Sequence, residues 1–334
     1  MILVTGATGI LGRVIVLELL KRGKTVRATK RKSSNLEEVK NSFRFYTENP
    51  NECFEKINWI DVDFDNLNSL EKALEGVEEV YHCAAKVSFH PNDEKKMYHT
   101  NIEGTTQLLY ACENSSVKKF LFVSSIAVLD GFNENGELDE SSDFNPKVDH
   151  SAYAISKHFA EMEVWRASAE GLNTVIVNPG IIIGSGNWKE SSGTLFKELG
   201  ENAYTFSGGT SYVDVRDVAQ ISIELMEKNI FGERFILVSE SAKYKEIGNS
   251  IRQKLGKSPM KLLPNVVLKV GFYLNLLFGW LFSPLKMANK VNVQSVTEFN
   301  KISNKKIKEK LNYEFIPLEE SLAFHLENYK KDRG

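Results

Sequence analysis

The 334-residue sequence is poor in the residues that build covalent or metal-bound frameworks. Its three cysteines, Cys53, Cys83 and Cys112, are too few and too dispersed for a disulfide framework or a metal cluster. We therefore expect free, buried thiols in a reducing compartment, and no metal site.

An excess of charge of one sign is also missing. The sequence has 42 Lys and Arg against 44 Asp and Glu, a formal net charge of −2. A dedicated nucleic-acid-binding protein normally carries a basic excess or stripe, so the composition argues against that class. No charged and apolar leader precedes the first expected strand at Ile2–Thr5, and we expect a cytoplasmic rather than a secreted protein.

One apolar segment approaches the length of a membrane span but does not reach it. Residues 262–288 are rich in Leu, Phe and Val, yet Lys269 and Asn275 interrupt them, and Pro264 and Pro284 bracket them. The uninterrupted part falls short of the roughly 20 residues that a spanning helix needs. We expect a buried or pocket-lining helix here. Docking on a membrane surface or on a partner protein is the alternative.

What the first half of the sequence does contain is a regular alternation of short β-branched runs with helical patterns. This alternation is typical of a parallel sheet with right-handed crossovers. The expected strands are Ile2–Thr5, Thr25–Thr29, Asn58–Asp61, Glu79–His82, Phe120–Val123 and Thr174–Val177. We predict an α/β fold with a doubly wound, Rossmann-type sheet over residues 1–178, to which residues 212–240 return. Residues 179–211 and 241–334 are expected to form a smaller, mostly helical substrate-binding lobe.

A glycine-rich turn joins the first strand to the first helix. Gly6, Gly9 and Gly12 follow Ile2–Thr5 directly, and a helix opens near Leu11. Glycine at these positions allows a tight turn, a close approach of the backbone to a diphosphate, and close packing of helix on strand. The free N–H groups at the helix start then bind the diphosphate. The pattern predicts a dinucleotide site formed by Gly6, Thr8, Gly9, Ile10, Leu11 and Gly12.

The end of the second strand indicates which dinucleotide binds. An NAD enzyme usually has Asp or Glu there, which accepts hydrogen bonds from the ribose and repels a 2′-phosphate. This strand instead runs into Lys30, Arg31 and Lys32, with no carboxylate in the turn. Arg31 can hold a phosphate bidentately, and the lysines add charge. We predict NADP(H) as the preferred cofactor. NAD(H) is the alternative if the turn is an ordinary basic surface.

Candidates for acid–base catalysis follow later in the chain. Tyr153 and Lys157 have the i,i+4 spacing that places two side chains on one face of a helix. A neighbouring ammonium favours the phenolate form of a tyrosine and so lowers its pKa. Upstream, the strand Phe120–Val123 ends in Ser124 and Ser125, and ligands of parallel sheets bind at the carboxyl ends of strands. We predict that Ser124 is a structural hydroxyl bonded to backbone and that Ser125, Tyr153 and Lys157 are catalytic.

Together with several further motifs, these features resemble the extended short-chain dehydrogenase/reductase family, within the NAD-dependent epimerase/dehydratase superfamily. The matching segments are Thr5–Gly12, Asp63-Phe64, Tyr81–Ala85, Asn101–Thr105, Ser124-Ser125, Tyr153 with Lys157, and Tyr212–Ala219. The resemblance implies that Asn101 is mainly structural. It also implies further cofactor-binding residues, which are, from the adenine end to the nicotinamide end, Asp63, Phe64, Ala84, Ala85, Lys86, Pro179 and Ile182.

Two segments, Val26–Arg31 and Asn178–Gly184, resemble the dihydroflavonol-reductase-like and 3β-hydroxysteroid-dehydrogenase-like branches of that family. Sugar-nucleotide epimerases and dehydratases typically carry Asn where Ile181 stands and Arg where Thr210 stands, and these two residues clamp the nucleotide diphosphate. The sequence lacks both. The resemblance therefore favours the reductase branches.

We expect an NADP(H)-dependent oxidoreductase that reduces an aldehyde or ketone, or oxidises the matching secondary alcohol, on an apolar or aromatic small molecule. Aromatic residues of the later segments are expected to line its pocket, with core packing as the alternative; they are Phe206, Tyr212, Phe272, Tyr273, Phe278 and Trp280. The alternative functions are an NAD-dependent sugar-nucleotide epimerase or dehydratase, and a dinucleotide-sensing protein without turnover. The sequence leaves monomer and homodimer open.

Overall fold

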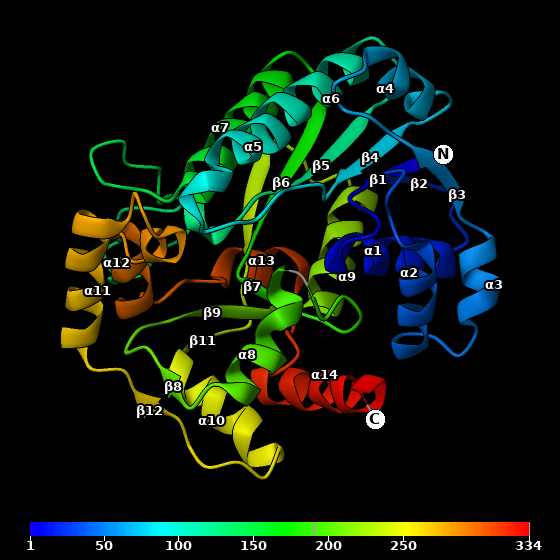
Figure 1. Cartoon of the computed structure of the whole chain (residues 1–334). Helices are drawn as coiled ribbons and strands as arrows, with labels where there is room; N and C mark the ends of the chain where they lie inside the picture. Colours follow the sequence, from blue (N-terminus) through cyan, green and yellow to red (C-terminus); the bar gives the residue numbers. More distant parts are fainter. Residues whose placement is uncertain (190, 334) are drawn as a thin grey trace.

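A seven-stranded parallel sheet lies at the centre of the computed structural model, which describes residues 1–189 and 191–333 (Figure 1). In spatial order its strands are β10 (Glu233–Leu237), β6 (Asn173–Pro179), β5 (Lys119–Val123), β4 (Glu79–His82), β1 (Ile2–Thr5), β2 (Val26–Lys30) and β3 (Asn58–Asp61). β1 pairs with β2 on one side and with β4 on the other, so the chain winds in both directions from the centre. This order leaves a crevice at the carboxyl ends of the central strands. The predicted fold class is confirmed, and each of the six expected strands is present.

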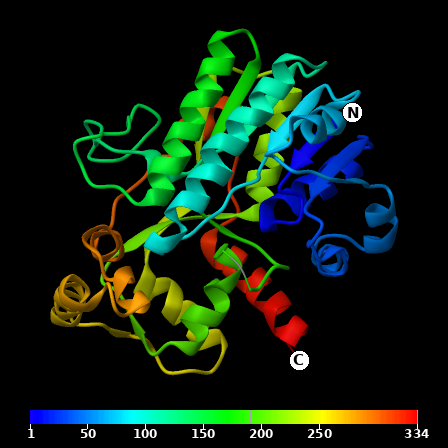
Figure 2. The ribbon, with the colours of Figure 1, turned by 45° about the horizontal axis from the view of Figure 1, so that its top comes forward.

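The apolar side chains of the sheet alternate between two layers of helices. In β1, Leu3 belongs to one apolar cluster, whereas Ile2 and Val4 belong to the other, because successive side chains of a strand point to opposite faces. Residues of α4 (Leu67–Leu74), α6 (Gly104–Glu113) and α7 (Ala152–Ala169) complete the first cluster, and residues of α1 (Ile10–Lys21) and α9 (Val215–Glu227) complete the second. Figure 2 shows α6 and α7 side by side over one face of the sheet.

Helix α1 follows from its sequence pattern. Leu11, Val14 and Leu17 recur at helical spacing, and all three are buried. The helix ends at Lys21, and Gly23 adopts a φ of +72°, which glycine reaches without steric cost.

Beyond the carboxyl ends of the main strands lies a smaller group of elements. A three-stranded sheet contains β7 (Ile181–Ile183), β9 (Gly209–Asp214) and β11 (Glu240–Lys243), and a two-stranded one contains β8 (Tyr204–Thr205) and β12 (Lys261–Leu262). Helices α8 (Leu195–Glu201), α10 (Tyr244–Lys254) and α14 (Leu318–Arg333) pack around the three-stranded sheet. After β9 the chain returns through α9 and β10 to the main sheet. We retain the division into a cofactor-binding part and a substrate lobe as a proposal.

Several short elements connect these layers. They are α2 (Leu36–Ser42), α3 (Pro50–Glu55), α5 (Glu94–Tyr98), α12 (Lys290–Thr297), α13 (Lys305–Leu311), and the short helices Phe43–Phe45, Pro91–Asp93, His99–Glu103, Ile126–Val128, Ser191–Thr194 and Ser283–Met287. The three cysteines are free, but only Cys112 is buried, whereas Cys53 and Cys83 are half-buried.

Helix α11 (Asn265–Phe278) is not buried, which corrects one part of the expectation of a buried or pocket-lining helix, whereas its residue Leu268 lines the crevice described below. None of its residues is buried, and it lies at the edge of the molecule, away from the main sheet (Figure 1). An apolar run of this length has the same composition in a core and on a surface, so the sequence pattern could not separate the two. Within residues 1–189 and 191–333, no helix is long and apolar enough to cross a membrane.

Candidate active site

The glycine-rich turn after β1 forms a cradle that leaves no room for side chains. Gly6 has a φ of +63°, and a Cβ added there would lie 2.7 Å from the backbone nitrogen of Ala84. A Cβ on Gly12 would lie 2.3 Å from the carbonyl oxygen of Gly6. Gly9 caps α1 without any side-chain hydrogen bond, so the N–H groups of the first turn face the crevice unobstructed. Close backbone, free N–H donors and a helix N-terminus together fit the diphosphate of a dinucleotide.

A buried arginine, which the sequence analysis missed, fastens this cradle. The Arg13 side chain is fully buried, and its guanidinium donates to the carbonyl oxygens of Thr8 and Gly9. It also forms a two-point ion pair with Glu38, with N–O distances of 2.7 and 2.9 Å. Because Arg13 lies on α1 and Glu38 on α2, the pair links the loop after β2 to the glycine turn.

The basic turn after β2 lies at the same crevice, and a neighbouring strand adds a carboxylate that the sequence pattern did not indicate. Lys30, Arg31 and Lys32 all line the crevice. However, parallel pairing of β2 with β3 sets Lys30 beside Asp61, and the Lys30 ammonium lies 2.5 Å from the Asp61 carboxylate. The turn itself has no carboxylate, yet the neighbouring strand supplies one. Arg31 and Lys32 are exposed, which leaves them as the cations available to a phosphate.

Ser125, Tyr153 and Lys157 come together at the carboxyl end of β5. Ser125 lies two residues beyond the end of β5 and caps the short helix Ile126–Val128, while Tyr153 and Lys157 lie one turn apart on α7. The Ser125 hydroxyl accepts from the Ala127 backbone N–H at 3.1 Å and is close enough to the Tyr153 phenol to lower its pKa. The Lys157 ammonium donates to the carbonyl oxygen of Val123 at 2.7 Å and lies 4.1 Å from the centre of the Phe122 ring. All three predicted catalytic residues line the crevice.

Burial governs the protonation of this set. Burial raises the pKa of Tyr153 above its usual range, although the hydrogen bond with Ser125 lowers it in part. Burial also lowers the pKa of Lys157 to about 7, against an opposing effect of the Glu161 carboxylate. Desolvation is the largest of these effects on Tyr153, so its neutral phenol is favoured, and the lowering of its pKa by Lys157 stays a prediction. Tyr153 is held as a proton donor.

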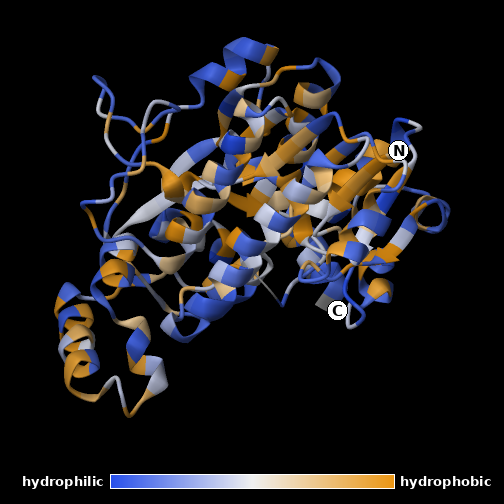
Figure 3. Ribbon diagram, turned by 90° about the horizontal axis from the view of Figure 1, so that it is seen from above, coloured by the Kyte–Doolittle hydropathy of each residue, from blue (hydrophilic) through white to orange (hydrophobic). Residues whose placement is uncertain are grey.

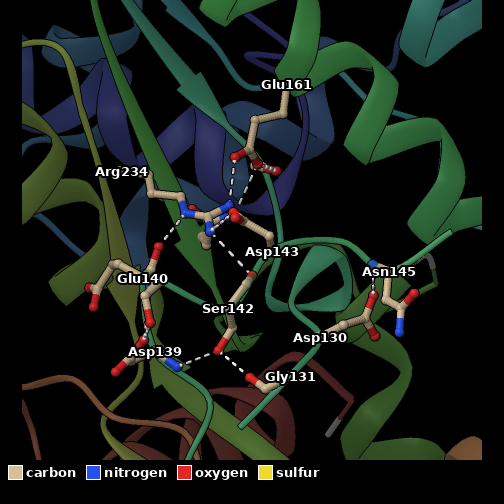
Figure 4. Close-up of polar contacts among 12 residues, drawn as sticks. Asp130, Gly131, Asp139, Glu140, Ser142, Asp143, Asn145, Glu161 and Arg234 are labelled. Atoms are coloured by element: carbon tan, nitrogen blue, oxygen red, sulfur yellow. Dashed lines mark hydrogen bonds and ion pairs between the residues drawn. The ribbon is translucent and has the colours of Figure 1, made fainter. Parts of the chain in front are cut away.

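A buried carboxylate that the sequence pattern did not indicate connects the elements around the site. Glu161 is 1% exposed and follows Lys157 by one turn of α7. It accepts hydrogen bonds from the Ser124 hydroxyl at 2.6 Å and from the Asn178 amide at 3.2 Å, and it is ion-paired with Arg234 at 3.3 Å (Figure 4). Ser124 is thus structural, as expected, but its hydroxyl donates to this carboxylate and not to backbone.

Arg234 extends the same network to the loop that follows the short helix Ile126–Val128. Its guanidinium donates to the carbonyl oxygens of Glu140 and Ser142 and pairs with Asp143 at 3.1 Å (Figure 4). One arginine on β10 therefore ties that loop to the helix that carries Tyr153 and Lys157.

A second buried clamp fixes the chain after β4. The Asn101 amide accepts from the Lys86 backbone N–H at 2.7 Å and donates to the Lys86 carbonyl oxygen at 2.9 Å and to the Ser156 hydroxyl at 2.9 Å. Asn101 is 1% exposed and lies in the π-helical turn His99–Glu103. It positions a loop and a helix of the site, which agrees with the structural role that the family resemblance implies.

These elements enclose one continuous crevice with a volume of 3330 Å³. The remaining predicted cofactor residues line it, namely Thr8, Ile10, Leu11, Asp63, Phe64, Ala84, Ala85, Pro179 and Ile182. Lys86 is the predicted residue that does not line the crevice; its ammonium lies 3.4 Å from the Asp93 carboxylate.

The predicted aromatic lining of the substrate pocket is partly wrong. Phe206 and Tyr212 line the crevice, but Phe272, Tyr273, Phe278 and Trp280 do not. Leu285, from the segment 262–288 that was expected to line the pocket, also lines the crevice. So do apolar side chains from loops that no sequence pattern indicated; they are Phe89, Phe132, Val148, Trp188 and Phe299. Contacts between segments that are distant in the sequence bring these residues to the crevice, and no local sequence pattern predicts such contacts.

Comparisons with known proteins agree with this geometry. The model of the NAD dependent epimerase/dehydratase family matches residues 2–237. The sterol demethylase protein B of Methylococcus capsulatus is 31% identical over 71% of this chain and 69% of its own. The dihydroflavonol 4-reductase of Gerbera hybrida is 26% identical over 75% of this chain and 71% of its own.

A solved structure shows the same fold over the whole length. The UDP-glucose 4-epimerase of Thermotoga maritima, with UDP-glucose, has a TM-score of 0.77 and covers 100% of this chain and 99% of its own at 22% identity. A doubly wound sheet with this crevice and a Tyr/Lys/Ser set defines a dinucleotide-dependent enzyme of the short-chain dehydrogenase/reductase kind. The chain belongs to the NAD-dependent epimerase/dehydratase family and thus to the extended short-chain dehydrogenases/reductases.

Proposed function

We propose that the protein is an NADP(H)-dependent carbonyl reductase that converts an apolar or aromatic aldehyde or ketone to its alcohol, or catalyses the reverse oxidation. The observation that carries the proposal is the convergence of Ser125, Tyr153 and Lys157 beside the glycine cradle. A single crevice contains both the groups that can hold a dinucleotide and those that can transfer a proton.

Each member of the set has a distinct task. The bound dinucleotide supplies a hydride to the carbonyl carbon. Tyr153 gives its phenolic proton to the carbonyl oxygen, so that one C–H and one O–H bond form and an alcohol results. Ser125 donates a hydrogen bond to the same oxygen, which takes a place between the two hydroxyls. Lys157, in its ammonium form, stabilises the phenolate that Tyr153 becomes.

The other predicted contacts follow the length of a dinucleotide. Gly6, Gly9 and Gly12 would hold the diphosphate, and Asp63 with Phe64 would flank the adenine. Ala84, Ala85, Pro179 and Ile182 would line the path to the nicotinamide. At the ribose, Arg31 and Lys32 would favour a 2′-phosphate, which is the basis for NADP(H) over NAD(H).

The substrate class follows from the aromatic residues that line the crevice. Phe89, Phe132 and Phe299 are among them, and the Phe89 ring packs edge-on against that of Tyr153. Apolar walls with a few convergent polar groups suit a mainly apolar substrate. Ile181 and Thr210 lie on β7 and β9 at this crevice. The Ile181 side chain cannot hydrogen-bond to a phosphate, and Thr210 lacks the charge of the Arg that sugar-nucleotide enzymes carry there.

The test is turnover with C4-deuterated NADPH and a panel of apolar aldehydes and ketones. We expect one NADPH to be consumed per alcohol formed, with deuterium on the carbinol carbon. Interconversion of a UDP-sugar without net NADPH consumption would instead establish the epimerase or dehydratase alternative. Tight NADPH binding without turnover on the whole panel would establish a sensor.

A further inference from the structure

Exposed apolar side chains are concentrated in one part of the described chain. Thirteen of its 23 exposed large hydrophobic residues lie between Leu262 and Met287, which we call the apolar segment. Figure 3 shows α11, the core of this segment, as a hydrophobic ribbon at the margin of the molecule. Single exposed apolar residues are normal, but a contiguous patch marks a binding surface.

The exposed positions cover a broad arc of the helix. Val266, Val270, Tyr273 and Leu277 form one stripe at helical spacing, and their exposed fractions are 68%, 50%, 62% and 64%. Exposed apolar residues also flank this stripe, at Val267, Leu274, Leu276 and Phe278. A helix-to-helix contact buries a narrow seam, whereas a lipid phase has no shape and accepts a broad apolar arc.

The charge around the apolar segment identifies its partner. Residues 247–297 contain seven basic residues and no acidic one, although the whole chain carries a net charge of −2. Arg252 is buried, and Lys254 and Lys290 are paired with carboxylates from outside the stretch, so the other four lysines carry its uncompensated charge. Lys261 and Lys269 are exposed within this stretch. Anionic lipid headgroups complement such a surface. A second copy of this chain would instead oppose two basic surfaces, which favours lipid over self-association.

The aromatic residues and the helix length define how deep the segment lies. Trp280 is 80% exposed and Tyr273 62%, and both residue types favour the headgroup region of a bilayer. The 14 residues of α11 extend over about 21 Å, less than the ~30 Å of the hydrocarbon core. The geometry is that of a helix in the plane of the interface and not across it.

The inner side of the same segment belongs to the crevice. Leu268, Leu285 and Met287 line it. The segment is bonded to the short helix Pro91–Asp93 through Asn92, whose side chain accepts from the Lys286 ammonium at 3.0 Å and donates to the Ser283 hydroxyl at 3.3 Å. If the outer side of the apolar segment contacts lipid, the crevice on its inner side lies next to the bilayer.

We propose that the apolar segment docks the protein on an anionic lipid surface, in the plane of the bilayer, so that apolar molecules pass from the lipid into the crevice. The docking stands independently of the proposed reductase activity. The passage of substrate from the lipid into the crevice rests on the proposed reductase activity.

The first experiment measures co-sedimentation of the purified full chain with neutral phosphatidylcholine vesicles and with vesicles that also contain phosphatidylserine. We expect stronger binding to the anionic vesicles. The double variant Leu277→Glu/Trp280→Glu is expected to lose binding by about tenfold or more, because it removes apolar contact and adds repulsion. Lys261→Ala and Lys269→Ala should each weaken binding to the anionic vesicles by about fivefold and leave binding to the neutral ones unchanged.

Phe159→Glu is the matched control, since Phe159 is 50% exposed and lies on α7, outside the apolar segment. It should bind vesicles like the wild type. Melting temperature and NADPH affinity should be unchanged in the double variant, because Leu277 and Trp280 do not line the crevice. Absence of binding to the anionic vesicles, or equal binding by the wild type and the double variant, would overturn the proposal. The proposal would also be overturned if the wild type were a dimer that binds no vesicles and if the double variant were a monomer.

A second readout separates docking from catalysis. With a ketone that partitions into the vesicles, kcat/KM of the double variant should fall, while kcat/KM for a water-soluble aldehyde stays unchanged. If the wild type and the double variant had equal kcat/KM values for the vesicle-borne ketone, the proposed passage of substrate from the lipid would be overturned. If no carbonyl is reduced in either form, the proposed reductase function fails, and co-sedimentation still decides the docking.

Discussion

Replacing Arg31 with Ala should separate the affinities for NADPH and NADH. Arg31 lies in the exposed turn after β2 and lines the crevice. Across the part of the chain that the structure describes, its guanidinium has no carboxylate partner in an ion pair. Lys30 differs, because Asp61 already neutralises its ammonium. The preference for a 2′-phosphate should therefore depend most strongly on Arg31.

The size of the effect follows from the exposure of the contact. A charge-assisted hydrogen bond to phosphate contributes about 1.5–3 kcal/mol, and each ~1.4 kcal/mol corresponds to a tenfold change in affinity. Solvent and salt reduce the contribution of exposed charges, so the lower end applies. We expect Arg31→Ala to weaken NADPH binding by about tenfold and NADH binding by less than about twofold. Asp61→Asn should have the opposite effect on NADPH, because it frees Lys30 and removes a carboxylate.

The assay is a pair of fluorescence titrations, with NADPH and NADH, at one fixed ionic strength. Wild type, Arg31→Ala and Asp61→Asn are compared with Lys118→Ala, which removes an exposed lysine that is paired with Glu78 and does not line the crevice. Equal affinities of the wild type for the two dinucleotides would refute the reasoning. A loss of NADH affinity in Arg31→Ala as large as the loss of NADPH affinity would refute it too.

Three further changes test the site. Gly12→Ala would place a Cβ 2.3 Å from the Gly6 carbonyl oxygen, so NADPH affinity should fall by about tenfold or more; unchanged affinity in a titration would remove the cradle from the account. Burial lowers the pKa of Lys157 from 10.5 to about 7, so between these values the unfolded chain binds a proton that the native state releases. The unfolding free energy of the wild type, measured with urea, should therefore rise with pH in this window relative to that of Lys157→Met, and a constant difference would contradict the pKa. Glu161→Gln leaves Arg234 without its buried counter-charge and should lower the unfolding free energy by about 2–3 kcal/mol, whereas a stability equal to the wild type would show that the network is dispensable.

Much of the Rossmann-type sheet could be predicted because its signals are local. Buried parallel strands such as Phe120–Val123 read as short apolar runs, and a glycine triplet between a strand and a helix has few other uses. The catalytic set was accessible for the same reason, since Tyr153 and Lys157 are helical neighbours and Ser125 ends a strand.

What the sequence concealed depends on contacts between distant segments. Asp61 meets Lys30 only through pairing of β2 with β3, and the ion pair between Arg13 and Glu38 joins two helices. Glu161 is an ordinary helical residue until the fold sets Ser124, Asn178 and Arg234 around it.

The exposure of the apolar segment could not be predicted for a different reason. An apolar helix has the same composition in a core and on a surface, and only the packing of its neighbours distinguishes the two. Here α11 packs against the short helix Ser283–Met287 and against α12, and its outer side stays exposed.

The central claim is that Tyr153 transfers the proton in a dinucleotide-dependent carbonyl reduction. Its most direct test is kcat for NADPH-dependent reduction by the wild type and by Tyr153→Phe, together with the NADPH dissociation constant of each. The variant lacks only the phenolic hydroxyl, so kcat should fall by about 10²–10⁴-fold while the dissociation constant changes by less than about threefold. A variant that retains a kcat near that of the wild type would contradict the account.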